Sequence, residues 1–196
     1  MQRSIILTLL AGVFAGPALA TGFTGPAAPA NFVVSLSGNL VGPLAAGGAV
    51  FSATELALTG GDASTGCDGG VYATLPGPCE VRALLLQAGD YRFDWAYASA
   101  DGAGPAGDIF GVVVDGQVSA LSDPGGAVSQ SGSRLYSAAS SFGWFLNCTD
   151  CTGGNATVTL GNFSTTAVPE PAVALLLLAG LAGVGALRRQ RGAPAA

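Results

Sequence analysis

Histidine and lysine are absent from the 196-residue sequence, and charged residues make up only 10% of it. Without histidine, this chain alone can form no Ser-His-Asp triad, no histidine metal site and no imidazole general base. Its cations are seven arginines, against twelve aspartates and glutamates, so the formal net charge is −5. A basic nucleic-acid-binding surface is therefore excluded, and we expect no nucleic-acid partner.

Long helices are disfavoured by the content of glycine and proline, which number 31 and 11. Both residue types destabilise the interior of a helix, because glycine has the most backbone freedom to lose and proline lacks an amide donor. We therefore do not expect a mainly helical protein. The exceptions are two apolar runs, one at each end of the chain.

The N-terminal run is typical of a secretory signal peptide. Arg3 supplies the positive region, residues 5–14 form the apolar region, and Ala18-Leu19-Ala20 is a small-residue cleavage site. The apolar region is too short to span a bilayer comfortably, and Gly16-Pro17 interrupts the run. We expect the Sec machinery to export the chain and residues 1–20 to be removed, rather than to remain as an anchor helix.

The C-terminal run, residues 172–187, contains no polar side chain and is followed by Arg188, Arg189 and Arg191. As a helix it would reach about 24 Å, short of the roughly 30 Å hydrocarbon core of a bilayer. Arginines that extend to the headgroups lengthen the effective span. Because arginines favour the cytoplasmic side, they orient the helix with everything upstream exported.

The residues around this run resemble a PEP-CTERM sorting signal. Val168, Pro169, Glu170 and Pro171 form the motif, and the apolar helix and the basic tail (residues 188–191) follow it to the chain end. The resemblance covers residues 168–196 and implies a Gram-negative envelope and cleavage near the motif by a membrane-embedded exosortase. The two prolines fit such recognition, since they keep the chain extended. The alternative is a permanent anchor behind a proline-rich linker.

The part between the two ends predicts strands. Residues 21–30 are rich in glycine, proline and alanine, and we expect a flexible lead-in there. Residues 31–167 contain about nine apolar or alternating segments separated by turn residues, the clearest being the aromatic row Tyr91, Phe93, Trp95 and Tyr97. The expected strands are residues 32–37, 50–58, 71–75, 81–87, 91–98, 109–114, 117–121, 142–146 and 156–161.

This pattern predicts an all-β fold with a single antiparallel β-sandwich, jelly-roll-like or immunoglobulin-like. Residues 109–114 are apolar on both faces, so we expect an interior strand, and Asp115-Gly116 after it indicates a two-residue hairpin turn. Segments 108–116, 121–126, 130–132, 141–143 and 150–151 are similar to a recurring arrangement in other PEP-CTERM ectodomains. That likeness implies no activity.

Four cysteines lie in the expected sandwich: Cys67, Cys79, Cys148 and Cys151. An even number in an exported chain favours disulfides. We favour a Cys67–Cys79 bridge and a local Cys148–Cys151 bridge, while crossed pairing stays open. The C-x-x-C spacing is also that of redox and zinc sites, but it lies between expected strands rather than at a helix N-terminus, and a second close pair is missing.

Asp101 and Asp108 bracket a glycine-rich loop. Oxygen-rich loops can bind Ca²⁺, so these two residues are candidate ligands. The loop lacks an alternating D-x-D-x-D spacing, however, and aspartate and glycine also make ordinary turns. We therefore expect no metal and no cofactor.

Two other functions are compatible with the composition. A carbohydrate-binding module would expose Trp95 or Trp144, whereas an aromatic row in a sandwich normally faces the core. A glycan hydrolase would need two carboxylates across a cleft, and Glu55, Glu80 and Asp94 are the candidates. Nothing in the sequence pairs these carboxylates, and no nucleophile–base arrangement is visible, so we expect no enzyme.

We therefore expect a non-enzymatic exported protein of the cell surface or extracellular matrix, which the resemblance associates with exopolysaccharide or biofilm. Residues 168–171 are expected to be the sorting motif for the exosortase. Residues 172–187 are expected to anchor the precursor in the membrane, with Arg188, Arg189 and Arg191 setting its orientation. The mature form is expected at the cell surface or outside the cell.

Overall fold

The computed structural model describes residues 19–37, 47–61, 80–148, 153–167 and 180–182. Most of these residues lie in eleven strands. The strands are β1 (Leu19–Thr21), β2 (Phe32–Ser37), β3 (Gly48–Phe51), β4 (Leu56–Thr59), β5 (Glu80–Leu85), β6 (Gly89–Ser99), β7 (Asp108–Val114), β8 (Gln117–Ala120), β9 (Ser129–Ala138), β10 (Phe142–Cys148) and β11 (Ala156–Ala167). Three short 3-10 turns are η1 (Gly25–Ala27), η2 (Pro29–Asn31) and η3 (Gly104–Ala106).

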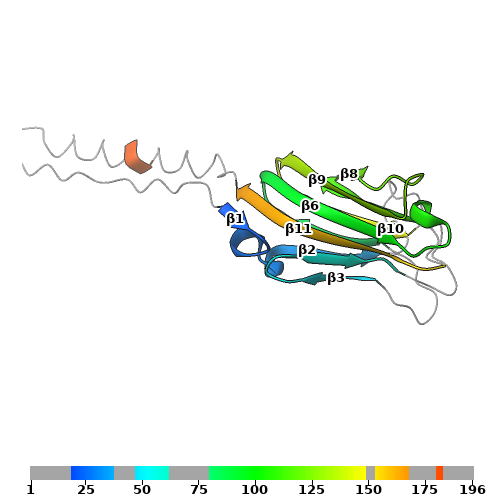
Figure 1. Cartoon of the computed structure of the whole chain (residues 1–196). Coiled ribbons are helices and arrows are strands. Elements are labelled where there is room, and N and C mark those ends of the chain that lie inside the picture. The colour runs from blue at the N-terminus through cyan, green and yellow to red at the C-terminus, as the bar shows by residue number, and fades with distance from the viewer. Residues whose placement is uncertain (1–18, 38–46, 62–79, 149–152, 168–179, 183–196) are drawn as a thin grey trace, which may run out of the picture.

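The strands form two sheets, with antiparallel pairing between neighbouring strands throughout. Sheet A has the order β3-β4-β11-β6-β9, and β1 pairs with the last part of β11. Sheet B has the order β2-β5-β10-β7-β8. From β4 to β11 the chain changes sheet at every connection except the β7–β8 hairpin, and Figure 1 shows the strands as two layers.

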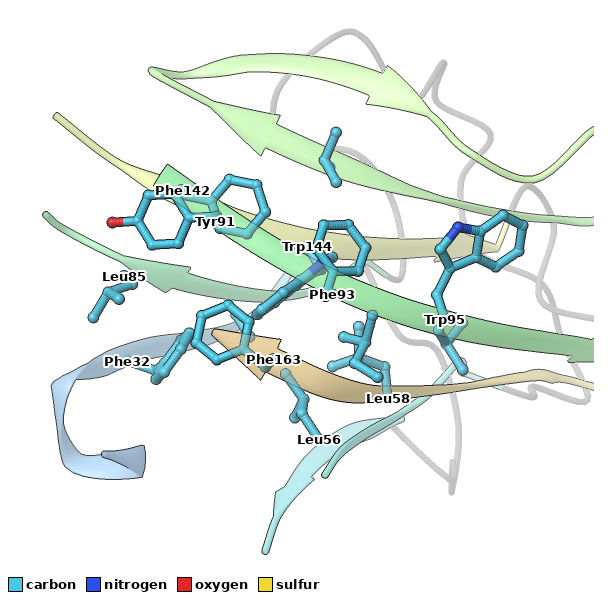
Figure 2. Packing of buried hydrophobic residues seen from close by; sticks show 14 of the residues in the cluster. Phe32, Leu56, Leu58, Leu85, Tyr91, Phe93, Trp95, Phe142, Trp144 and Phe163 are labelled. Atoms are coloured by element: carbon cyan, nitrogen blue, oxygen red, sulfur yellow. The ribbon is translucent and has the colours of Figure 1, made fainter. Parts of the chain in front are cut away.

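One hydrophobic core fills the space between the sheets. The four aromatic residues that alternate along β6 all lie on its inner face and are buried, as the sequence predicts. From sheet B, the Phe142 ring stacks on Tyr91 with a centroid distance of 4.4 Å, and Trp144 meets Phe93 edge-on at 5.3 Å (Figure 2). The expected all-β fold with two antiparallel sheets is confirmed, and their packing is sandwich-like.

The expected interior position of β7 is also confirmed. It lies between β10 and β8, and residues on both of its faces are buried. Phe110 and Val112 belong to the central core, while Ile109 and Val113 form a second cluster with Phe145 on the outer face of sheet B. This double burial explains why the sequence of β7 is a continuous apolar run rather than an alternation.

Asp115 and Gly116 form the expected two-residue turn between β7 and β8. Their φ angles are +50° and +81°, the positive values that a type I′ turn requires at both central positions. The Asp115 carboxylate also closes the β9–β10 connection. It accepts hydrogen bonds from the backbone amides of Ala139 (2.9 Å), Ser140 (2.7 Å) and Ser141 (3.0 Å).

The single strand expected over residues 50–58 is wrong. The segment is a hairpin in which β3 ends at Phe51 and β4 begins at Leu56. The Ser52 hydroxyl oxygen accepts a hydrogen bond from the Glu55 amide at 2.9 Å, and the Ser52 amide donates to the Glu55 carbonyl at 2.8 Å. A serine side chain thus closes a turn inside a segment whose apolar residues suggested continuous extension.

The flexible lead-in expected over residues 21–30 is also wrong. Phe23 is buried in the core and stacks on Phe163 at 4.9 Å. The Gly22 amide donates to the Phe163 carbonyl, and the Phe23 amide donates to the Ala53 carbonyl. Gly22 has a φ of +66°, and a Cβ there would lie 2.3 Å from the Ala53 oxygen, so only glycine fits. One aromatic side chain is enough to anchor a segment of low apolar content.

No strand is expected from the sequence over β9, yet it forms the edge of sheet A beside β6. Its residues are mostly polar, and only Tyr136 and Ala138 pack against the core. Backbone pairing with β6, rather than side-chain packing, therefore holds β9 in the sheet. The strand expected over residues 71–75 lies outside the described residues.

We expect Trp144→Ala to lower the free energy of unfolding by roughly 3–5 kcal/mol, because the substitution leaves a large cavity between the sheets. The matched control is Leu135→Ala, at a position on β9 that is 70% exposed, for which we expect a change within about 0.5 kcal/mol. Urea denaturation of the full chain, followed by circular dichroism, measures both. Equal effects of the two substitutions would contradict the core position of Trp144.

Hydrogen bonds to Asp115, first that from the Ala139 amide and then that from the Ser140 hydroxyl, lower the pKa of its carboxyl from 3.8 to about 2. Because the pKa is lower in the folded state, the stabilisation is present above pH 4 and is lost as the pH falls toward 2. We expect Asp115→Asn to be less stable than the wild type at pH 6, with the difference shrinking between pH 4 and pH 2. Thermal unfolding at several pH values measures this. A difference that stays constant with pH would contradict the role of the charge.

Candidate functional site

The outer face of sheet A carries small, hydroxyl-rich side chains where β11, β6 and β9 lie side by side. The register aligns two rows across these strands. One row is Thr157, Ala98 and Ser129, and the other is Thr159, Ala96 and Ser131. All six side chains are exposed.

These rows form a shallow groove with a volume of about 440 Å³. The alanine methyl groups are its floor, because they belong to the middle strand, β6. Threonines from β11 form one wall and serines from β9 the other. The groove therefore offers uncharged hydrogen-bonding groups on both sides of an apolar strip.

Asp94 follows the groove in the next row along β6. Its carboxylate accepts hydrogen bonds from the Ser133 hydroxyl of β9 and from the Asn162 side-chain amide of β11, the latter at 2.6 Å. These two bonds lower the pKa of Asp94, with a smaller contribution from the positive charge of Arg92. The carboxyl group is therefore ionised at neutral pH, and it places a negative charge beside the groove.

Both tryptophans face the core, so neither provides a surface for stacking a sugar. Trp95 is 5% exposed and Trp144 is fully buried. The Trp95 ring packs against Phe110 at 5.5 Å, across the two sheets. The expectation that the aromatic row is a core row is confirmed, and the exposed tryptophan that the carbohydrate-binding alternative required is not found at either position.

The three carboxylates considered for a hydrolase lie in separate parts of the fold. Glu55 is exposed in the β3–β4 turn, and Asp94 is on the outer face of sheet A. Glu80 is buried on the opposite outer face, that of sheet B, where it forms an ion pair with Arg82. Because packed sheets lie about 10 Å apart, Glu80 and Asp94 cannot flank one glycosidic bond.

Asp101 and Asp108 are both buried at the end of the sandwich where β6 leads to β7. The Ser99 hydroxyl donates to Asp108 at 3.0 Å and accepts from the Asp101 amide at 3.1 Å, so the structure brings the two residues to one corner. Tyr97 donates to the Asp108 carbonyl, and burial raises the pKa of Tyr97 to about 12. Among the described residues, no third side chain of a metal-ligating type joins them.

The sorting residues of the sequence analysis, residues 168–171 together with Arg188, Arg189 and Arg191, lie outside the described residues. Within the expected membrane helix, residues 180–182 are described and are helical. In the part of the chain that the structure describes, no helix has the length and hydropathy needed to cross a membrane. The sorting signal therefore stays a prediction.

Sequence reasoning missed the hydroxyl-lined groove. The available signal was the period-two spacing of Ser129, Ser131, Ser133 and Ser137, which places four serines on one face of a strand. A strand that exposes serines resembles a loop in sequence, so the alternation was informative only once β9 was known to pair with β6.

Comparison with known proteins assigns neither a family nor a function to the chain. No protein-family model matches the chain, and no curated protein matches it.

Cys148 is the one cysteine among the described residues; it is buried at the end of β10 and is not a free thiol. Asn147, which precedes it, pairs with Glu80 of β5. Cys67, Cys79 and Cys151 lie outside the described residues, so the favoured bridges Cys67–Cys79 and Cys148–Cys151, and the crossed pairing, stay predictions.

We expect the bridges that the sequence favours, Cys67–Cys79 and Cys148–Cys151. Proteolytic mapping without reductant, followed by mass spectrometry, would identify the linked peptides. A peptide that links Cys148 to Cys67 or to Cys79 would contradict the expectation.

Proposed function

We propose that the chain is an exported, non-enzymatic protein of a Gram-negative cell surface or extracellular matrix, sorted through its C-terminal segment. The observation that supports the proposal is the position of the two chain ends. Leu19 of β1 pairs with Thr166 of β11 in antiparallel register, so the chain enters and leaves the body at the same end (Figure 1). A single attachment region suits a domain held by one end.

The opposite end of the body then points away from the attachment. The register places the end of β6 beside the start of β11, with Ser99 opposite Ala156. Asp108 and Cys148 pair at the same end of sheet B. The buried aspartates Asp101 and Asp108, together with Cys148, thus belong to the end that faces away from the membrane in the proposed precursor.

Removal of a signal peptide after Ala20 is compatible with this body. Cleavage there would leave Thr21 as the first residue, and Thr21 pairs with Ser164. The hydrogen bond from the Gly22 amide to the Phe163 carbonyl and the buried Phe23 ring both lie beyond the cut. The mature chain would lose the buried Ala20 and the pairing of Leu19 with Thr166, but it would keep the contacts of Gly22 and Phe23.

A jelly roll is the finer fold that we propose. The strand order β4-β11-β6-β9 in one sheet and β5-β10-β7-β8 in the other supports it, because eight consecutive strands divide equally between two sheets and repeatedly cross between them. An immunoglobulin-like sandwich would instead keep seven or nine strands in another order. β3 and β2 then extend one edge of each sheet, and β1 pairs with the last part of β11.

The expected roles of the C-terminal residues complete the proposal. Residues 168–171 are the motif that an exosortase recognises, residues 172–187 hold the precursor in the membrane, and the basic tail orients it. The wide separation of Glu55, Glu80 and Asp94 supports a non-enzymatic body. Disulfides formed after export would stabilise the end of the sandwich that carries Cys148.

We expect the native protein from the cell envelope and the medium to have an intact mass that begins at Thr21 and ends near residues 168–171, with or without an added group. Mass spectrometry of separate fractions measures this. As a matched control, Pro169→Ala combined with Glu170→Ala should remain full length at its C-terminus. A wild-type mass that extends to Ala196 in every fraction would contradict sorting and would make the C-terminal run a permanent anchor.

A further inference from the structure

The groove on the outer face of sheet A combines the two kinds of contact that a sugar ring makes. Each of its four wall hydroxyls can both donate and accept a hydrogen bond, as sugar hydroxyls also do. The methyl groups of Ala96 and Ala98 form an apolar strip between the walls, where the C–H face of a ring can lie. Because every wall side chain is short, the backbone positions hold these groups in place with little loss of side-chain entropy.

The dimensions suit a single extended chain. Neighbouring strands lie about 4.8 Å apart, so the threonine and serine walls are about 9.6 Å apart across β6. Successive rows along the strands are about 6.7 Å apart. An α-helix, at about 10–12 Å across with its side chains, is too wide to enter.

The charge of this face selects against an anionic ligand. Asp90 and Asp94 lie on the outer face of β6, and Asp94 directly follows the groove. Among the described residues that the register places on this face, Arg92 is the single cation. An anionic polymer would meet a net negative surface, whereas a neutral one would not be repelled.

We propose that this groove binds a neutral polysaccharide chain, which lies along β6 with its hydroxyl groups bonded to Thr157, Thr159, Ser129 and Ser131. The inference deepens the proposed matrix role and rests on it for the source of the glycan. The binding itself requires only the register of β11, β6 and β9. It differs from the aromatic stacking considered in the sequence analysis, because it uses no tryptophan.

The test is calorimetric titration of the full chain, purified in a detergent without a sugar headgroup, with three neutral hexasaccharides: cellohexaose, laminarihexaose and maltohexaose. Ala96→Leu fills the floor of the groove without adding charge. We expect wild-type chain to bind at least one hexasaccharide and Ala96→Leu to bind it at least about tenfold more weakly. The matched control is Ala106→Leu, at an exposed position in η3 outside the groove, which should bind as the wild type does.

A second variant is needed because Ala96→Leu could also lose binding by misfolding. Thr157→Ala combined with Thr159→Ala removes two wall hydroxyls at exposed positions and should also weaken binding while leaving the thermal unfolding midpoint nearly unchanged. The proposal is overturned if no neutral hexasaccharide binds, if both groove variants bind like the wild type, or if alginate binds more tightly than all three. Each of these results can occur whether or not the C-terminus is processed, so the mass measurement separates failure of sorting from failure of glycan binding.

Discussion

The packing around the Trp144 indole is the contact on which the rest of the body depends. The ring lies within 5.1–5.4 Å, centroid to centroid, of Phe142, Phe93 and Phe163, which come from both sheets. Phe23, from the segment after β1, meets it at 6.2 Å. These contacts join sheet A, sheet B and the N-terminal segment in one aromatic cluster. These rings are among the largest fully buried side chains of the described residues, so their burial is a main source of stability.

Because the aromatic side chains of β6 point into the core, its small and charged side chains lie on the outer face of sheet A. β6 places its rings on one side, and the pleat therefore turns Arg92, Asp94, Ala96 and Ala98 to the other. Residues of β11 and β9 that align with the alanines are threonines and serines. The same alternation thus produces a bulky core on one face and the shallow, hydroxyl-lined groove on the other.

Local patterns in the sequence correctly predicted the elements whose conformation depends mainly on residues close together in the chain. The bounds of β2 match the expected strand, and the aromatic alternation of β6 and the Asp115-Gly116 hairpin are confirmed. β9 was missed because its stability comes from pairing with β6 rather than from its own side chains. The groove could not be predicted, because it requires three strands far apart in the chain to align Thr157, Ala98 and Ser129, and a single sequence does not carry that register.

The position of β11 determines how the body responds to tension. This strand of twelve residues runs from the groove threonines to Ala167, where the chain leaves the body. It pairs with β6 on one side, before and after a register shift between Gly161 and Ser164, and with β4 and β1 on the other side. A pull on residue 167 acts along the strand, perpendicular to its ladder hydrogen bonds, so these bonds resist in shear and must yield together. The strand that leads out of the body is therefore held against such a pull by neighbouring strands on both of its sides.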